Sequence, residues 1–186
     1  MPLPLDNDGI LALVNRAQDG DTEAFAEVYD HFFLPIYRYT AFRAPREMVE
    51  DLVSDVFVKA WEKLHTYKAR ADIPFGAWLF RIARHTVIDA YRTQRQFDEI
   101  PEEVADLDPM NRADAATRSA ELLETVQDAL ARLPRRYRDV LLLSYVSELP
   151  HSAVARVLKM SEGGVRILKF RALRKLKELL PADLAS

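Results

Sequence analysis

The sequence contains no cysteine, which excludes disulfide bonds, cysteine-ligated zinc and thiol nucleophiles. Its four histidines, His31, His65, His85 and His151, are never four residues apart, so paired histidine ligands on one helix are not expected. No apolar run approaches about 18 residues, and residues 1–6 lack the charged and apolar regions of a secretory leader. We therefore predict a cytoplasmic protein with no metal, no cofactor and no membrane insertion.

Glycine is also scarce, because the chain has only five glycines against ten prolines. A sandwich or barrel of many short strands needs more turn residues, whereas abundant alanine, leucine, arginine and glutamate favour helices. The 186 residues are 49% hydrophobic and 30% charged, which is enough apolar material for a folded core. This length suits one domain or two small ones. We predict an all-α protein with two small cores.

Charge is distributed unevenly along the chain. Residues 1–96 carry 12 basic and 14 acidic side chains, residues 97–118 carry 2 and 7, and residues 119–186 carry 12 and 8. The middle segment is interrupted by two prolines and lacks an apolar repeat, so we interpret it as a flexible acidic linker. The predicted helical domains are therefore 1–96 and 119–186. The basic surplus of the second domain suggests an anionic partner.

The first domain shows helical periodicity throughout. Apolar side chains recur at intervals of three and four residues across 25–36, and again across 49–64. A third long helix is predicted at 74–95, with a proline in its first turn. A shorter helix is expected near 9–19. Together these helices predict a small bundle.

The second domain contains shorter apolar repeats, separated at Pro134 and near Pro150. Two further helices are predicted at 152–158 and 162–180. The three residues between them match the length of a helix-turn-helix corner, and Ser161 is a suitable N-cap for the last helix.

The last helix is strongly basic. Between residues 165 and 177 it has six basic residues and no acidic one, beside an apolar stripe that can pack on a core. As the second helix of a helix-turn-helix it can enter a major groove about 12 Å wide. A solvated cationic face is the alternative, but the helix-turn-helix spacing favours DNA binding. The six residues are Arg166, Lys169, Arg171, Arg174, Lys175 and Lys177.

The helix at 74–95 offers a second candidate surface. Several of its cations fall on one face at helical spacing. Nearby aromatic rings are of the kind that stack on unpaired bases, at ~1–3 kcal/mol each. A core position is the alternative for Trp78 and Phe75, and we favour it for Phe75. The residues concerned are Arg81, Arg84, His85 and Arg92, with Tyr67, Phe75 and Trp78.

The helix at 46–64 has a different character. Its apolar stripe includes Phe57 and Trp61 and is wide enough to leave part of its surface for a protein partner. Asp51 and Asp55 are four residues apart and could act as an acid–base or metal-binding pair, but no matching second pair is evident. We therefore do not expect an enzyme.

Two blocks of the sequence resemble a known family. LVNRAQDGDTEAFAEVYDHFFLPIYRYTAFR, VEDLVSDVFVKAWEKL and PFGAWLFRIARHTVIDAYR are similar to region 2 of the extracytoplasmic-function (group 4) sigma factors of bacterial RNA polymerase. LARLPRRYRDVLLLSYVSELPHSAVARVLKMSEGGVRILKFRALRKLKELL is similar to their region 4. The likeness covers nearly the whole chain except the first residues and the linker. It departs from the family at His85, where asparagine is common, and at Lys159, where glycine is usual.

The resemblance implies partners and site residues. Core RNA polymerase would bind through the clamp helices of its largest subunit, promoter DNA would be recognised at its -35 and -10 elements, and an anti-sigma factor is common in the family. The polymerase contacts, or the core directly behind them, would comprise Asp51, Asp55, Phe57 and Trp61. The contacts to the melted -10 strand would be Tyr67, Arg81, Arg84, His85, Asp89 and Arg92. The contacts to the -35 duplex would be Arg166, Lys169, Phe170, Arg171 and Arg174.

Our interpretation is a sigma factor that directs promoter-specific initiation by core polymerase. The alternative is a stand-alone helix-turn-helix regulator that binds duplex operators as a dimer, with the first domain as a sensor or dimerisation module. The two differ in whether tight, salt-dependent duplex binding requires polymerase. A catalytic site in the first domain is the third and weakest hypothesis.

Overall fold

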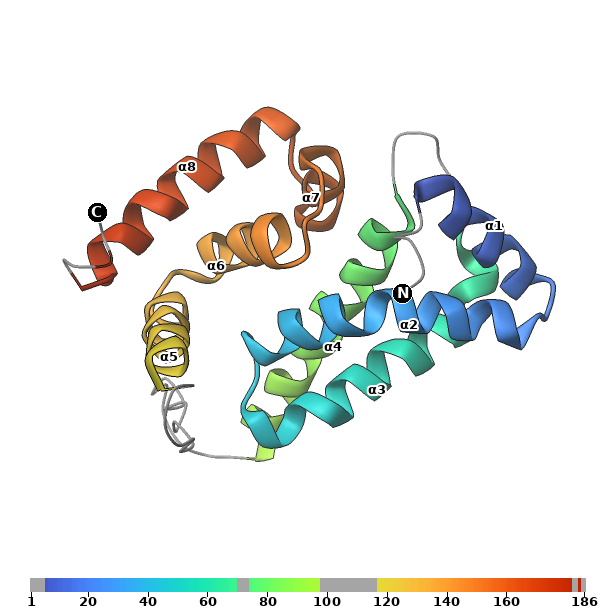
Figure 1. Ribbon diagram of the computed structural model, residues 1–186, viewed down its shortest axis with the longest axis horizontal. Helices are drawn as coiled ribbons and strands as arrows, with labels where there is room; N and C mark the ends of the chain where they lie inside the picture. The colour runs from blue at the N-terminus through green and yellow to red at the C-terminus, as the bar shows by residue number, and fades with distance from the viewer. Residues whose placement is uncertain (1–5, 70–73, 98–116, 182–183, 185–186) are drawn as a thin grey trace.

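The computed structural model describes residues 6–69, 74–97, 117–181 and 184, and every regular element among them is helical. The predicted all-α class is therefore confirmed. The N-terminal domain contains α1 (Asn7–Gln18), α2 (Thr22–Ala41), α3 (Arg46–Lys63), the 3-10 turn η1 (Leu64–Thr66) and α4 (Phe75–Phe97) (Figure 1). The C-terminal domain contains α5 (Thr117–Ala131), α6 (Arg135–Leu141), the π-helical turn η2 (Leu142–Val146), α7 (His151–Leu158) and α8 (Glu162–Leu179). The predicted linker falls mostly on residues 98–116, outside the described part of the chain.

Two aspartates determine where the first helices begin. The Asp6 carboxylate accepts a hydrogen bond from the backbone N–H of Gly9 at 2.8 Å, and the Asp21 carboxylate accepts one from that of Ala24 at 3.0 Å. The Ala24 hydrogen bond, together with Arg16, lowers the pKa of Asp21. These caps satisfy backbone donors that a helix leaves unpaired at its start.

The helices α7 and α8 form a helix-turn-helix, as the spacing predicted. Ser161 is the N-cap of α8, and its Oγ accepts a hydrogen bond from the Gly164 N–H at 3.1 Å. Lys159 ends α7 in the left-handed region, with φ 54° and ψ 56°, where glycine is favoured. A Cβ atom on Gly164 would lie 3.1 Å from the Met160 Cε and 3.2 Å from the Ser161 Oγ, so this glycine allows close packing at the corner.

The two domains share a buried core, whereas the sequence predicted two separate ones. One cluster of buried side chains runs through both domains, with α7 packed on α4 and η2 packed on α2. At the start of α4, a Cβ on Gly76 would lie 3.2 Å from a Phe32 ring atom and 3.4 Å from the Leu149 Cδ2. Leu149 belongs to the C-terminal domain, so glycine lets the backbone of α4 approach that domain closely. Each domain thus covers apolar surface that the other would leave exposed.

Candidate nucleic-acid and polymerase interfaces

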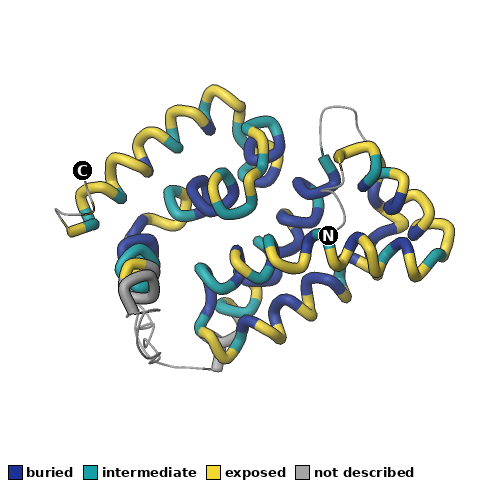
Figure 2. The backbone as a smooth tube through the Cα atoms, in the orientation of Figure 1, coloured by how far each residue is buried: buried dark blue, intermediate teal, exposed yellow. Residues whose placement is uncertain are grey.

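The helix α8 presents an exposed outer face (Figure 2). Val165 and Ala172 are buried against the rest of the domain, so the opposite side of the helix points outward. Ile167 and Phe170 lie on that outward side and are 56% and 67% exposed. Cations flank this pair, because Arg166, Arg171 and Arg174 are exposed as well. The outer face therefore combines an apolar centre with basic edges.

Lys169 lies apart from this outer face. Its Nζ is 5.2 Å from the ring centroid of Tyr145 in η2, and its side chain is half-buried. A cation–π contact of this kind holds the amine against its own domain. Of the residues predicted for the -35 element, Lys169 is thus at the edge of the outer face.

Ile167 is absent from the predicted DNA contacts. Ile167 is exposed and lies three residues before Phe170, so helical spacing puts both side chains on the outer face of α8, with Ile167 near its centre. The signal in the sequence is an isoleucine outside the stripe Val165, Leu168 and Ala172 that packs on the domain. An apolar residue outside the packing stripe of a basic helix marks a contact surface.

The helix α4 carries most of the residues predicted for the -10 strand. Arg81, His85, Asp89 and Arg92 are exposed on it. Arg84 differs, because its Nε donates to the Asp139 carboxylate of α6 at 2.9 Å. Burial lowers the pKa of Arg84, and the Arg43 guanidinium lowers it further. Arg84 therefore faces the C-terminal domain in this structure.

His85 stands beside these cations. Partial burial lowers the pKa of His85, and the adjacent positive charges of Arg84, Arg81 and Lys159 act in the same direction, against an opposing effect of Asp89. The imidazole is thus neutral at pH 7. A neutral imidazole can both donate and accept a hydrogen bond, as base edges require.

The aromatic rings near the start of α4 pack on one another. Tyr67 is buried, with its ring centroid 5.1 Å from that of Phe75 and 5.5 Å from that of Trp78. Trp78 is half-buried, so its ring keeps some exposed surface, unlike those of Tyr67 and Phe75. The expectation of a core position for Phe75 is confirmed, since it is 0% exposed. Tyr67 was predicted as a base contact, but in this structure its ring forms part of the core.

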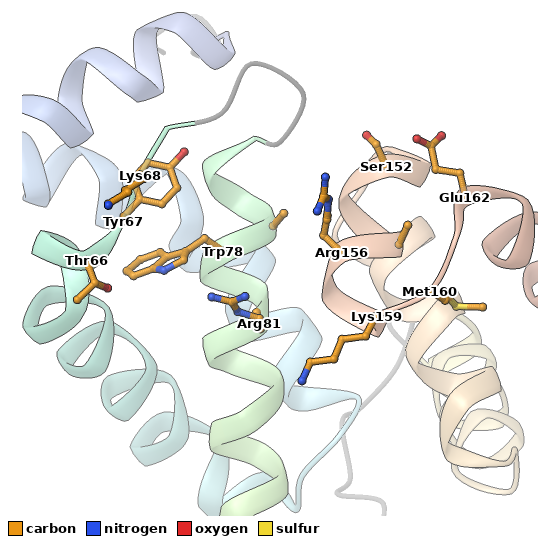
Figure 3. A pocket seen from close by; sticks show the side chains of 12 residues that line it. Thr66, Tyr67, Lys68, Trp78, Arg81, Ser152, Arg156, Lys159, Met160 and Glu162 are labelled. Carbon is orange, nitrogen blue, oxygen red and sulfur yellow. The ribbon is translucent and has the colours of Figure 1, made fainter.

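A cavity of about 820 Å³ lies between the two domains (Figure 3). Tyr67, Lys68, Trp78 and Arg81 line it from the N-terminal domain. The opposing wall comes from α7 and the corner, with Ser152, Arg156, Lys159, Met160 and Glu162. Cationic side chains thus line both walls. The ring of Trp78 lies beside Tyr67, on the side of α4 away from α7 (Figure 3).

The helices α2 and α3 expose an aromatic surface. Tyr29, Phe33, Leu34, Val58 and Trp61 are between 37% and 56% exposed, and we call these five residues the α2–α3 patch. The ring of Trp61 lies 4.8 Å from that of Phe25, centroid to centroid. The contribution of α2 was missed from the sequence, because its aromatic residues fit the same helical spacing as its core residues.

The predicted polymerase contacts on α3 divide between surface and core. Asp51 and Asp55 are exposed, and the Lys59 Nζ is 3.4 Å from an Asp55 carboxylate oxygen. Phe57 is 5% exposed, and its ring packs behind that of Tyr29 at 4.4 Å between centroids. Phe57 therefore supports the α2–α3 patch from the core, whereas Tyr29 and Trp61 have exposed rings.

Among residues 6–69, 74–97, 117–181 and 184, no group of three or more histidine, aspartate or glutamate side chains is arranged to hold a metal ion. Within the same ranges, no helix is both long and apolar enough to cross a membrane.

Two family models match the chain in the order that the sequence suggested. Sigma-70 region 2 matches residues 29–97, and Sigma-70 region 4 matches residues 123–176. The chain is 32% identical over 185 residues to the ECF RNA polymerase sigma factor BldN of Streptomyces coelicolor, which covers 96% of this chain and 68% of that protein. It is 33% identical over 192 residues to the RNA polymerase sigma factor CnrH of Cupriavidus metallidurans, covering 97% of both.

A solved structure extends the likeness to three dimensions. The structure of CnrH in complex with the cytosolic domain of CnrY matches with a TM-score of 0.70 at 27% identity, over 94% of this chain and 97% of that one. Both domains are thus included in the match. Since the helix-turn-helix, the N-terminal bundle and the full-length relatives agree, this chain belongs to the extracytoplasmic-function sigma factors of bacterial RNA polymerase.

Proposed function

We propose that this sigma factor binds core polymerase through α2 and α3, reads the -35 duplex with α8 and holds the melted -10 strand with α4. The outer face of α8 carries the proposal, because Phe170, Arg171 and Arg174 are exposed on a helix whose other side is buried. The protein itself catalyses no reaction in this scheme. Polymerase supplies the chemistry in the cytoplasm, and the sigma factor selects where transcription starts.

The -35 element is read by base and phosphate contacts of different kinds. The guanidinium groups of Arg166, Arg171 and Arg174 suit guanine edges and phosphates. Ile167 and Phe170 form the apolar centre of the same face. They suit contact with the thymine methyl, which is the apolar group that DNA presents in its major groove. The proposed -35 site therefore includes Ile167 beside the predicted residues, and it prefers thymine at the centre of the contact.

The -10 strand is held on α4. Arg81 and Arg92 supply charge for its phosphates, Trp78 offers a ring for an unpaired base, and His85 with Asp89 can contact base edges. Arg84 joins this set once it is released from Asp139.

Polymerase determines the spacing of the two contacts. We place the polymerase-binding and -10 module at residues 1–96, the linker at 97–118 and the -35 module at 119–186. The exposed rings of Tyr29 and Trp61 suit the interface core that protein partners use, with Asp51 and Asp55 at its rim. Holding both modules on one large enzyme raises the effective concentration of each for its own DNA element.

An anti-sigma factor is the proposed regulator. The matching CnrH structure contains the cytosolic domain of CnrY. A partner of that kind would bind this chain by contacting both domains and would compete with polymerase.

Transcription with reconstituted holoenzyme tests the function. Core polymerase plus this protein should initiate at new sites on genomic fragments, and those sites should share two upstream sequence blocks. Arg171→Ala should weaken dependence on the upstream block alone, and Arg92→Ala dependence on the downstream block alone. Tight binding of the free protein to a palindromic duplex, with no new start sites, would instead favour the stand-alone regulator.

A further inference from the structure

A side-chain amide at the end of α1 joins that helix to the segment that precedes α4. Gln18 is the last residue of α1, and its Nε2 donates to the backbone carbonyls of Leu64 at 2.8 Å and Tyr67 at 2.9 Å. Leu64 begins η1, and Tyr67 directly follows it. A glutamine amide has two N–H donors, so one side chain can serve both carbonyls. The η1 turn is therefore fastened at both of its ends by a residue of another helix.

The corner between α1 and α2 gives Gln18 a fixed support. Gly20 turns the chain just after α1, with a φ of 97° that glycine adopts without strain. The Arg16 guanidinium meets the Asp21 carboxylate at 2.7 Å, and the same side chain is the N-cap of α2. The last turn of α1 is thus tied to the start of α2. Gln18 transmits the position of this corner to η1.

The ring of Tyr67 carries the connection onward to α4. It is 7% exposed, and its centroid is 5.1 Å from that of Phe75 and 5.5 Å from that of Trp78 (Figure 3). Its hydroxyl is buried and has no hydrogen-bond partner in the part of the chain that the structure describes. No polar contact found there therefore anchors the phenol ring. Its position depends on packing and on the backbone that Gln18 holds.

The orientation of Trp78 matters because its ring is half-buried and keeps some exposed surface. A ring that stacks on an unpaired base binds best when it is already oriented, since ordering it during binding costs entropy. Tyr67 fills the space beside this ring. A displaced Tyr67 would let the ring of Trp78 turn, and less of its face would then meet the base.

We propose that Gln18 is a positioning residue for the -10 strand, because its amide holds η1 and Tyr67 in the place that orients the Trp78 ring. Gln18 acts on the strand through these two rings and not by touching it. This role rests on the proposed function, in which α4 holds the -10 strand.

Substitutions that separate donor capacity from side-chain length test this role. Gln18→Met and Gln18→Glu keep the length, but at pH 7 neither side chain can donate to the two carbonyls. Gln18→Lys retains N–H donors and should behave much as the unsubstituted protein does. Asn15→Asp, at an exposed position one turn earlier on α1, adds the same negative charge as Gln18→Glu and serves as its control.

Fluorescence of the free full-length protein reports on Trp78. The chain has two tryptophans, so Trp61→Phe leaves Trp78 as the single indole. In this background Gln18→Met and Gln18→Glu should increase acrylamide quenching of Trp78 and lower its fluorescence anisotropy, whereas Asn15→Asp should change neither. Circular dichroism checks that each variant is folded. Unchanged quenching and anisotropy in the folded Met and Glu variants, or equal changes in Gln18→Lys, would overturn the role of the amide.

Binding of the melted strand by holoenzyme gives the functional readout, measured with Trp61 in place. A fluorescent single-stranded oligonucleotide carrying the -10 element, mapped from transcript starts, should bind the Gln18→Met and Gln18→Glu holoenzymes about three- to tenfold more weakly, as expected for the loss of two neutral hydrogen bonds. The same holoenzymes should bind a -35 duplex with unchanged affinity, because α8 belongs to the other domain. Equal weakening for duplex and single strand would mean a general loss of structure and would overturn the positioning role.

Failure of this inference can be distinguished from failure of the proposed function. If the unsubstituted holoenzyme does not prefer the -10 oligonucleotide to a scrambled strand, the assignment of α4 is wrong and the role of Gln18 falls with it. If that preference is present, and the Gln18 variants loosen Trp78 without weakening the oligonucleotide, the role of Gln18 is overturned and the proposed function stands.

Discussion

The helices α4 and α8 are both basic and amphipathic, yet they differ in what surrounds them. The outer face of α8 is open to solvent, with Phe170 67% exposed. On α4, Arg84 is held by Asp139 of the other domain, whereas Arg81, His85 and Arg92 are exposed. Similar sequence signals for nucleic-acid binding can therefore belong to one face that is open throughout and to another that is partly engaged in a contact between domains.

Substituting one arginine on each helix should give the largest effects on DNA binding. Arg171→Ala should weaken binding of a -35 duplex by about 5- to 150-fold, from ~1–3 kcal/mol for a base contact, in the free protein and in holoenzyme alike. Arg84→Ala should change single-strand binding by the free protein by less than about twofold, because Arg84 is already held by Asp139 there. In holoenzyme the same change should weaken -10 recognition. Fluorescence anisotropy measures binding of the duplex and of the single strand. Equal losses of affinity for the two in the free protein would contradict the proposed difference between α8 and α4.

The apolar centre of α8 gives a smaller effect. Replacing thymine by deoxyuracil in the -35 duplex removes only the methyl group and should weaken binding about fivefold, from ~1 kcal/mol per methyl contact. Ile167→Ala should reduce that sensitivity, because the contacting surface is lost. Replacement of thymines outside the element serves as the control. Equal affinities for thymine and uracil duplexes would show that Ile167 and Phe170 do not face these methyl groups.

The corner of the helix-turn-helix gives an effect on stability. Lys159→Gly should raise the free energy of unfolding by about 0.5–1 kcal/mol, because relief of the left-handed backbone exceeds the extra entropy of glycine in the unfolded chain. Lys175→Gly, in the exposed middle of α8, should lower it by about 1 kcal/mol. Urea denaturation compares the two. A loss of stability in Lys159→Gly would mean that contacts of the lysine side chain outweigh the backbone cost.

The smallest expected effect is a change in the titration of His85. Its pKa is lowered by burial and by neighbouring cations, of which Lys159 belongs to the other domain. A lowered histidine pKa means that the neutral form favours the folded state, so this contribution is present above about pH 6.5 and is lost as the pH falls below it. In the Lys159→Gly protein the pKa should rise toward the ordinary value, because one of these cations is removed. Titration by nuclear magnetic resonance measures both, and identical values would place His85 away from the interface.

Local sequence patterns predicted the helices and their order closely. The helix predicted at 162–180 is Glu162–Leu179, and the one predicted at 152–158 is His151–Leu158. Apolar spacing and N-cap residues act within one or two helical turns, so they can be recognised without knowledge of the tertiary structure. The buried stripe of α8 was predicted for the same reason, since Val165 and Ala172 are both buried.

The all-α class, the helix-turn-helix and the basic character of α4 and α8 could be predicted from the sequence alone. Each of these features depends on residues that are close together in the chain. The tertiary structure was needed to show that Tyr67 and Phe57 belong to the core, and that Asp139 of one domain meets Arg43 and Arg84 of the other. Helical spacing groups side chains into faces, but the partner of each face is chosen by packing between segments far apart in sequence. Asp139 is 96 residues from Arg43 and 55 from Arg84, a pairing that no local pattern records.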